Sequence, residues 1–95
     1  MAGEKKMTRD KGNILVVEDS QIQAEMIRRV LAVNGYSVEI AKDGAEGLEM
    51  AGRLKPALII TDIVMPVMDG YEMGRRIKNS PALKGIPIIM LPGII

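Results

Sequence analysis

The sequence contains no cysteine, no histidine, no tryptophan and no phenylalanine, and these absences remove several classes of function. Without cysteine the chain can form neither a disulfide nor a thiolate metal site. Without histidine it lacks the commonest general base, the commonest metal ligand and the partner of a Ser-His or Cys-His catalytic pair. Any metal ion must therefore be held by oxygen atoms, which favours a hard cation such as Mg²⁺ or Ca²⁺.

An excess of charge of one sign is also lacking, since 13 basic residues face 12 acidic ones and the formal net charge is +1. The positive excess lies in residues 1–12, which we expect to be a disordered basic tail ahead of a single domain over residues 13–95. Aromatic residues are limited to two tyrosines, so we expect no base-stacking surface for nucleic acid.

Long apolar runs are missing as well. No segment approaches the ~18 apolar residues that a membrane-spanning helix needs, and residues 2–13 are too polar to begin a secretory signal. The sequence therefore predicts a soluble, cytoplasmic protein with no membrane partner.

The apolar pattern that is present alternates between strand and helix. Short β-branched runs predict buried strands, and apolar residues at intervals of three and four predict helices. We expect strands over 13–17, 37–41, 57–61 and 86–91, and helices over 21–34, between Asp43 and Pro56, and between Asp69 and Asn79. This order, with short connections, requires a parallel sheet with right-handed crossovers and helices on both faces.

The helix over 21–34 carries most of the apolar residues on one side of the expected sheet. They are Ile22, Met26, Ile27, Val30, Leu31 and Val33. Their spacing is helical, and we expect them to form one face that points inward.

Two of the expected buried strands end in carboxylates, and this feature indicates chemistry. Glu18 and Asp19 follow the first strand, and Asp62 follows the third. In an open parallel sheet, ligands bind outside the carboxyl ends of the strands. If these two strands are neighbours, three carboxyl groups converge, and a divalent cation is the simplest relief of their repulsion. The alternative is that Asp19 and Asp62 are ordinary turn or cap residues.

At this point the sequence resembles a known family. Val16-Val17-Glu18-Asp19-Ser20, followed by Asp62-Ile63-Val64-Met65-Pro66-Val67-Met68-Asp69-Gly70, is similar to the receiver domain of two-component response regulators. The resemblance runs from about Asn13 to Leu91. It implies an α/β, flavodoxin-like, doubly wound sheet, here reduced to four strands in the order 2-1-3-4 and three helices, without the last helix-strand-helix of the family.

The resemblance also implies roles for individual residues. Asp62 would be the phosphoacceptor, and Mg²⁺ would be the cofactor. Asp19 and Asp62 would bind Mg²⁺ directly, together with the backbone carbonyl of Val64, and Glu18 would act through water. We expect Met65 and Met68 to be packing residues, since thioethers suit soft metals.

The chain departs from the family at its end. Pro92 stands where the family has a Thr or Ser, and proline offers neither a hydroxyl nor an N–H group. No residue takes the place of the family's lysine on the fifth strand, because Lys84 precedes the fourth strand and lies at the wrong end. The ending is typical of a truncated or frame-shifted reading of a longer gene. We also expect self-association through the exposed strand over 86–91.

The leading hypothesis is a phosphoacceptor that takes a phosphoryl group from a histidine kinase or a histidine phosphotransfer protein, and that is not a turnover enzyme. The alternatives are a pseudo-receiver that binds partners without switching, and a non-functional fragment. A haloacid-dehalogenase-type phosphatase would need a second Asp at the position of Val64. A flavin site would need a hydroxyl- and glycine-rich loop in place of Glu18-Asp19-Ser20-Gln21, so both enzymes are poor matches.

Overall fold

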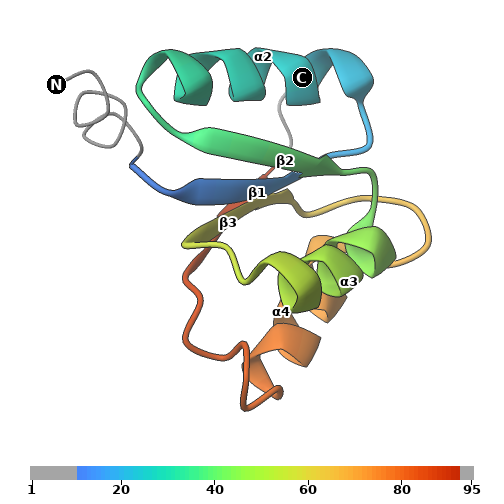
Figure 1. Ribbon diagram of the computed structural model, residues 1–95. Coiled ribbons are helices and arrows are strands. Elements are labelled where there is room, and N and C mark those ends of the chain that lie inside the picture. Colours follow the sequence, from blue (N-terminus) through green and yellow to red (C-terminus); the bar gives the residue numbers. More distant parts are fainter. Residues whose placement is uncertain (1–10, 93–95) are drawn as a thin grey trace, which may run out of the picture.

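Four parallel strands and three helices make up the computed structural model, which describes residues 11–92 (Figure 1). The elements, in chain order, are β1 (Asn13–Val17), α2 (Gln21–Val33), β2 (Ser37–Ala41), α3 (Gly44–Leu54), β3 (Leu58–Asp62), α4 (Gly70–Lys78) and β4 (Ile88–Leu91). The strand order is β2-β1-β3-β4 and every pair is parallel. This confirms the predicted four-stranded, flavodoxin-like arrangement.

The register of the sheet brings its acidic residues to one edge. Val17 at the end of β1 pairs with Thr61 near the end of β3. Glu18 and Asp62 are the next residues along the two chains, so they leave adjacent strands at the same rim. Asp62 pairs in turn with Leu91 on β4. The rim therefore receives the carboxyl ends of all three neighbouring strands.

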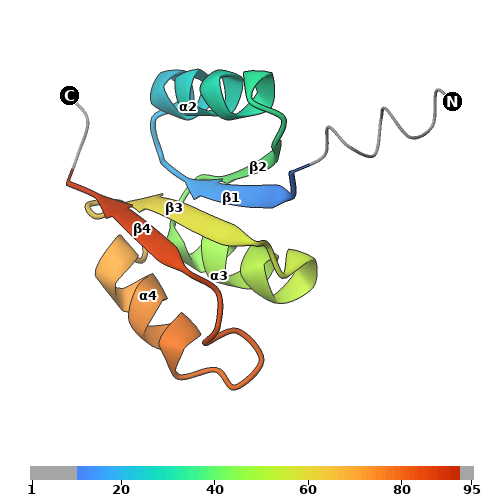
Figure 2. The same cartoon turned by 90° about the vertical axis from the view of Figure 1, so that its left-hand side faces the viewer.

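The helices divide unequally between the two faces of the sheet. Figure 2 shows α3 and α4 on one side and α2 alone on the other. The side of α3 and α4 holds the main core, which includes Leu15, Val17, Ile59, Met73 and Ile77, all fully buried. This face is closed by two helices, whereas on the other face α2 packs over β1 and β2.

Each helix begins at a side chain that caps it. Ser20, Asp43 and Asp69 have extended backbone conformations, and each accepts a hydrogen bond from the backbone N–H three residues later. Such caps satisfy N–H groups that have no partner inside the helix. Asp69 is thus a helix cap, as its position three residues before Glu72 indicates.

The inward face predicted for α2 is wrong in part. Ile27 and Leu31 are half-buried and lie on the same side as the buried Ala24. The other four apolar residues are exposed instead: Ile22, Met26, Val30 and Val33. The apolar residues of α2 occupy more than half of the helix circumference, and the sheet covers only one side of the helix.

Two strand boundaries also differ from prediction. β3 is shifted by one residue, so that Asp62 is its last member instead of the residue after it. β4 starts at Ile88 and not at Ile86, because Pro87 has no N–H group to offer the ladder. The carbonyl of Pro87 still accepts a hydrogen bond from the N–H of Ile59 at 3.0 Å.

The predicted basic tail over residues 1–12 falls mostly outside the described residues, and there it stays a prediction. Its last two members are described. The backbone N–H of Lys11 donates to the carbonyl of Gly35, and the carbonyl of Gly12 accepts from Ser37, each at 3.0 Å. Residues 93–95 also lie outside the described part of the chain.

Candidate functional site

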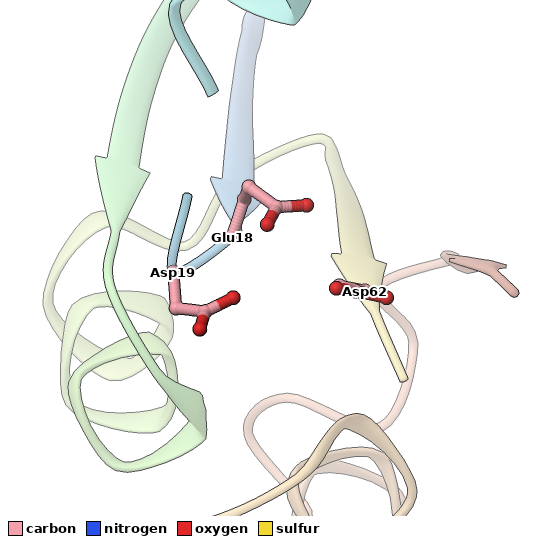
Figure 3. Close-up of side chains that lie close together, drawn as sticks. All are labelled: Glu18, Asp19 and Asp62. Atoms are coloured by element: carbon pink, nitrogen blue, oxygen red, sulfur yellow. The ribbon is translucent and has the colours of Figure 1, made fainter. Parts of the chain in front are cut away.

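Three carboxylates converge at the rim where β1 and β3 end. Glu18, Asp19 and Asp62 each offer one oxygen, and these oxygens all lie within 4.8 Å of one another. Figure 3 shows the side chains of Glu18 and Asp19, from the turn after β1, and of Asp62, at the end of β3. This convergence was expected if the two strands were neighbours, and β1 does pair with β3.

Asp62 is fixed by its own backbone neighbours. The N–H of Ile63 donates to Asp62 Oδ1 at 2.7 Å, and the hydroxyl of the buried Thr61 donates to the Asp62 carbonyl at 2.8 Å. The first helical residue after the loop is Gly70, and a Cβ at that position would lie 2.3 Å from the Asp62 carbonyl oxygen. Glycine at 70 therefore allows α4 to start directly beside Asp62.

Glu18 is the buried member of the cluster, with 4% of its surface exposed. Burial raises the pKa of its carboxyl group, and the nearby charges of Asp62 and Asp19 raise it further. The backbone N–H of Ser20 opposes this effect by donating to Glu18 Oε2 at 3.0 Å. The net pKa is raised, since the cost of burying a charge outweighs one hydrogen bond.

The donor set fits a hard divalent cation. All three groups are carboxylates, the ligands that Mg²⁺ and Ca²⁺ prefer. The charged groups that act on Glu18 are the carboxylates of Asp62 and Asp19, and no lysine or arginine of the described residues is among them. Asp19 is exposed and Asp62 is half-buried, which leaves room for water in the coordination shell, as Mg²⁺ requires.

The remaining predicted site residues lie around this rim. Val64 is two residues past Asp62, in the loop that leaves the rim, and 79% of its surface is exposed. Met65 is buried in the core, which agrees with a packing role. Pro92 is exposed and directly follows Leu91, the residue that pairs with Asp62. Lys84 is exposed and precedes β4, so it lies at the opposite end of that strand.

One contact near the site was not predicted. The backbone N–H of Gly44, at the start of α3, donates to the carbonyl of Met68 at 2.9 Å. A Cβ at position 44 would lie 2.3 Å from that same oxygen. This hydrogen bond therefore fixes the loop after Asp62 against the start of α3. The Asp43-Gly44 pair was a usable indication, because glycine directly after a cap residue often marks a close backbone approach.

The arrangement is matched by known proteins. Residues 14–93 match the model of the "Response regulator receiver domain" family. The response regulator MprA of Mycobacterium leprae (strain TN) is 42% identical over 78 residues, which cover 82% of this chain and 33% of that protein. The chain thus spans about a third of the length of the curated relatives it matches.

Solved structures agree with the sequence comparison. The signal receiver domain of a signal transduction histidine kinase from Syntrophus aciditrophicus superposes with a TM-score of 0.83 at 42% identity, over 88% of this chain and 64% of that one. The chemotaxis response regulator CheY4 of Vibrio cholerae gives a TM-score of 0.79 at 37% identity, over 82% and 65%. Within residues 11–92, no helix combines the length and apolar character needed to cross a bilayer.

Proposed function

The chain belongs to the response regulator receiver domain family of two-component systems, and from this premise we propose that Asp62 accepts a phosphoryl group with the help of Mg²⁺. The observation that supports this most is the convergence of Glu18, Asp19 and Asp62 within 4.8 Å at the carboxyl edge of the sheet. A cluster of this kind is suited to a cation and a phosphoryl group together.

The nucleophile in this proposal is a carboxylate oxygen of Asp62. It forms a bond to phosphorus while the bond from phosphorus to the donor breaks. From a phosphohistidine the imidazole nitrogen leaves with the bonding electrons, and from acetyl phosphate the leaving group is acetate. A carboxylate has no proton to lose, so the step needs no general base, in a chain that has no histidine.

The residues that would hold the ion are Asp19 and Asp62 directly, the backbone carbonyl of Val64, and Glu18 through water. When bound, Mg²⁺ offsets the charge of the phosphoryl oxygens and of the rim. Asp62 is oriented for this role by the N–H of Ile63, which donates to one of its two oxygens. The other oxygen remains available to phosphorus.

The partner in this proposal is a histidine kinase or a histidine phosphotransfer protein, and the domain is a phosphoacceptor, not a turnover enzyme. Asp62 lies half-buried at the rim, so a donor residue has to reach it there. Ile22 is exposed only three residues after Asp19, which offers such a partner an apolar contact beside the acidic cluster.

The test is incubation of the 95-residue chain with acetyl phosphate and Mg²⁺, followed by intact mass measurement. We expect one added phosphoryl group, no addition in EDTA, and none on Asp62→Asn. Asp69→Asn is the matched control, because asparagine also caps helices well and this variant should keep the adduct. An unmodified wild-type chain under these conditions would remove phosphoryl acceptance from the proposal.

A second candidate is a receiver that accepts the group without switching. Pro92 favours it, since it follows the residue that pairs with Asp62 and has no hydroxyl or N–H to contact a phosphoryl oxygen. Amide hydrogen exchange before and after phosphorylation separates the two candidates. Unchanged exchange in β4 would support the non-switching form, whereas a change there would support a switch.

A further inference from the structure

The loop that follows Asp62 contains a strained turn. The N–H of Met68 donates to the carbonyl of Pro66 at 2.7 Å, and Val67 between them has a φ of 70°. A hydrogen bond between residues two apart, across a positive φ, is the mark of the rare and strained form of the γ-turn. Val67 is 82% exposed, so packing of its own side chain contributes little to this conformation. The turn therefore persists because the structure around it holds it in place.

Two further hydrogen bonds restrain the loop on either side of this turn. At its base, the N–H of Gly70 donates to the carbonyl of Ile63 at 2.8 Å and closes the loop on itself. At the turn, the carbonyl of Met68 accepts from the N–H of Gly44 at 2.9 Å. The first bond fixes the two ends of the loop relative to each other. The second fixes the turn relative to α3, and so to the rest of the domain.

The start of α3 is a well-supported anchor for the loop. The buried Asp43 accepts a hydrogen bond from the N–H of Glu46 at 2.8 Å, and Glu46 Oε1 accepts from the N–H of Lys42 at 2.7 Å. These two bonds fix the chain on both sides of the helix start. The N–H of Gly44 lies in the first turn, where backbone donors have no partner inside the helix. It is therefore available to the loop at no cost to α3.

The close approach of the loop to α3 leaves no space for a side chain at position 44. A Cβ there would lie 2.3 Å from the carbonyl oxygen of Met68 and 3.0 Å from its Cβ. The crowded atoms include backbone, which cannot rotate away as the end of a side chain can. A larger residue must therefore displace the turn from α3. Val64 lies in the same loop, between Asp62 and the turn, and would be displaced with it.

We propose that Gly44 is a positioning residue of the phosphoacceptor site. Its N–H group and its lack of a side chain hold the loop over residues 63–69 so that the carbonyl of Val64 stays at the acidic rim. The role of that carbonyl toward Mg²⁺ rests on the proposed function, whereas the restraint on the loop rests on the hydrogen bonds themselves. Gly44 acts through the loop and is not a catalytic residue.

The test compares the same substitution at two glycines of α3. Gly44→Ala crowds the loop, whereas Gly47→Ala crowds side chains of the core, with Met73 Sδ at 2.8 Å and Val17 Cγ2 at 3.0 Å from the added Cβ. We expect both variants to be less stable, so Gly47→Ala controls for lost stability. Both are made in a Gly52→Ala background to keep the folded state populated. A Cβ at position 52 meets nothing within 4 Å, and alanine favours a helix more than glycine does.

The first measurement is amide hydrogen exchange, followed by NMR in the metal-free chain. The probes are the N–H groups of Met68 and Gly70, the donors within the loop. We expect Gly44→Ala to accelerate their exchange about fivefold or more over the background chain, the factor for losing one hydrogen bond of ordinary strength. Gly47→Ala should leave both unchanged. Unchanged exchange in Gly44→Ala, or equal acceleration in the two variants, would overturn the proposal.

The second measurement is the Mg²⁺ dependence of Tm and of the initial rate of phosphorylation by acetyl phosphate. We expect the half-maximal Mg²⁺ concentration to rise about tenfold in Gly44→Ala, as for other changes to groups that orient metal ligands, and to stay the same in Gly47→Ala. The rate at saturating Mg²⁺ should stay close to that of the background chain, because the change affects binding of the ion.

The two proposals fail in different ways. Accelerated exchange of the loop in Gly44→Ala with an unaltered Mg²⁺ dependence would overturn the positioning role of Gly44 and leave the proposed function intact. A background chain that binds Mg²⁺ but takes no phosphoryl group would instead contradict the proposed function. The exchange rates and the Mg²⁺ dependence of Tm would still decide the role of Gly44.

Discussion

The carboxylate of Glu18 accepts a hydrogen bond at 3.0 Å from the backbone N–H of Ser20, and Ser20 in turn caps α2 through its hydroxyl. The acidic rim and the first turn of α2 are therefore linked by one short chain of hydrogen bonds. A change in the charge of Glu18 acts on the site and on the start of the helix together, because both depend on the same carboxylate.

Glu18→Gln should stabilise the protein when no metal is bound. Burial raises the pKa of Glu18, so the folded state binds its proton more tightly than the unfolded chain does. The free energy of unfolding therefore rises as pH falls through this pKa, and the charged form is destabilising at neutral pH. We expect Tm in EDTA at pH 7 to rise by about 4 °C, measured by circular dichroism, and the Mg²⁺-induced rise in Tm to become smaller. A lower Tm in EDTA would contradict this account.

Asp19→Asn should weaken the response to Mg²⁺. Removing one of three clustered carboxylates lowers the negative charge that attracts the ion. We expect the Mg²⁺ concentration for half-maximal stabilisation to rise by about tenfold. Asp69→Asn is the control, since Asp69 accepts a hydrogen bond from Glu72 at the start of α4 and should leave the Mg²⁺ response unchanged. Equal responses of the two variants would exclude Asp19 as a ligand.

Two glycines of α3 should respond in opposite directions to alanine. At Gly44 a Cβ would lie 2.3 Å from the carbonyl oxygen of Met68, whereas at Gly52 it would meet nothing within 4 Å. We expect Gly52→Ala to raise the free energy of unfolding by about 0.5–1 kcal/mol. Gly44→Ala should lower it by about 2 kcal/mol. Urea denaturation measures both, and a neutral Gly44→Ala would mean that the loop can move away from α3.

Val67→Asn should stabilise the loop after Asp62. Val67 has a φ of 70°, a conformation that is unfavourable for a β-branched residue and more accessible to asparagine. We expect a gain of about 1 kcal/mol in the free energy of unfolding. Val64→Asn is the matched control, because Val64 is equally exposed in the same loop and is not among the described residues with positive φ. An equal gain in both variants would point to reduced surface hydrophobicity instead.

The ion pairs of Glu25 with Arg28 and Arg29 on α2 should contribute to acid sensitivity. Hydrogen bonds from Arg28 and Arg29 lower the pKa of Glu25 to about 2, from 4.5. A lowered pKa adds stability that is fully present above pH 4.5 and is lost as pH falls toward 2. Glu25→Gln should flatten the dependence of Tm on pH in this range. The effect should shrink in high salt, because exposed ion pairs are screened. Glu39→Gln, an exposed residue of β2, serves as the control.

The topology and the acidic cluster could be predicted because each depends on a simple pattern. Alternating apolar runs determine the β-α order, and parallel strands end at the same rim of a sheet. The strand order that makes β1 and β3 neighbours, and so brings Asp19 and Asp62 together, follows from the resemblance to receiver domains. The caps at Asp43 and Asp69 follow from their spacing to a glutamate three residues later. None of these inferences required knowledge of side-chain packing.

Other features could not be read from the sequence, because they depend on which surfaces meet. The spacing of Ile22, Met26, Val30 and Val33 is the spacing of a buried face, yet these residues are exposed. Periodicity identifies an apolar side of a helix, but it does not say how many neighbours cover that helix. The contact between Gly44 and Met68 and the φ of Val67 likewise arise from loop closure, which residue type alone does not determine.

The two-sided apolar character of α2 also bears on how the helix is oriented during folding. Hydrophobic burial fixes the rotation of an ordinary amphipathic helix about its long axis, because only one side can face the sheet. For α2, a half-turn about that axis would still place aliphatic side chains on β1 and β2. The polar contacts of Ser20 and Glu18 at its first turn must then select the correct rotation. We therefore expect a metal ion at the acidic rim to restrict the rotation of α2 about its long axis. This restriction would extend to residues of α2 that lie far from the ion.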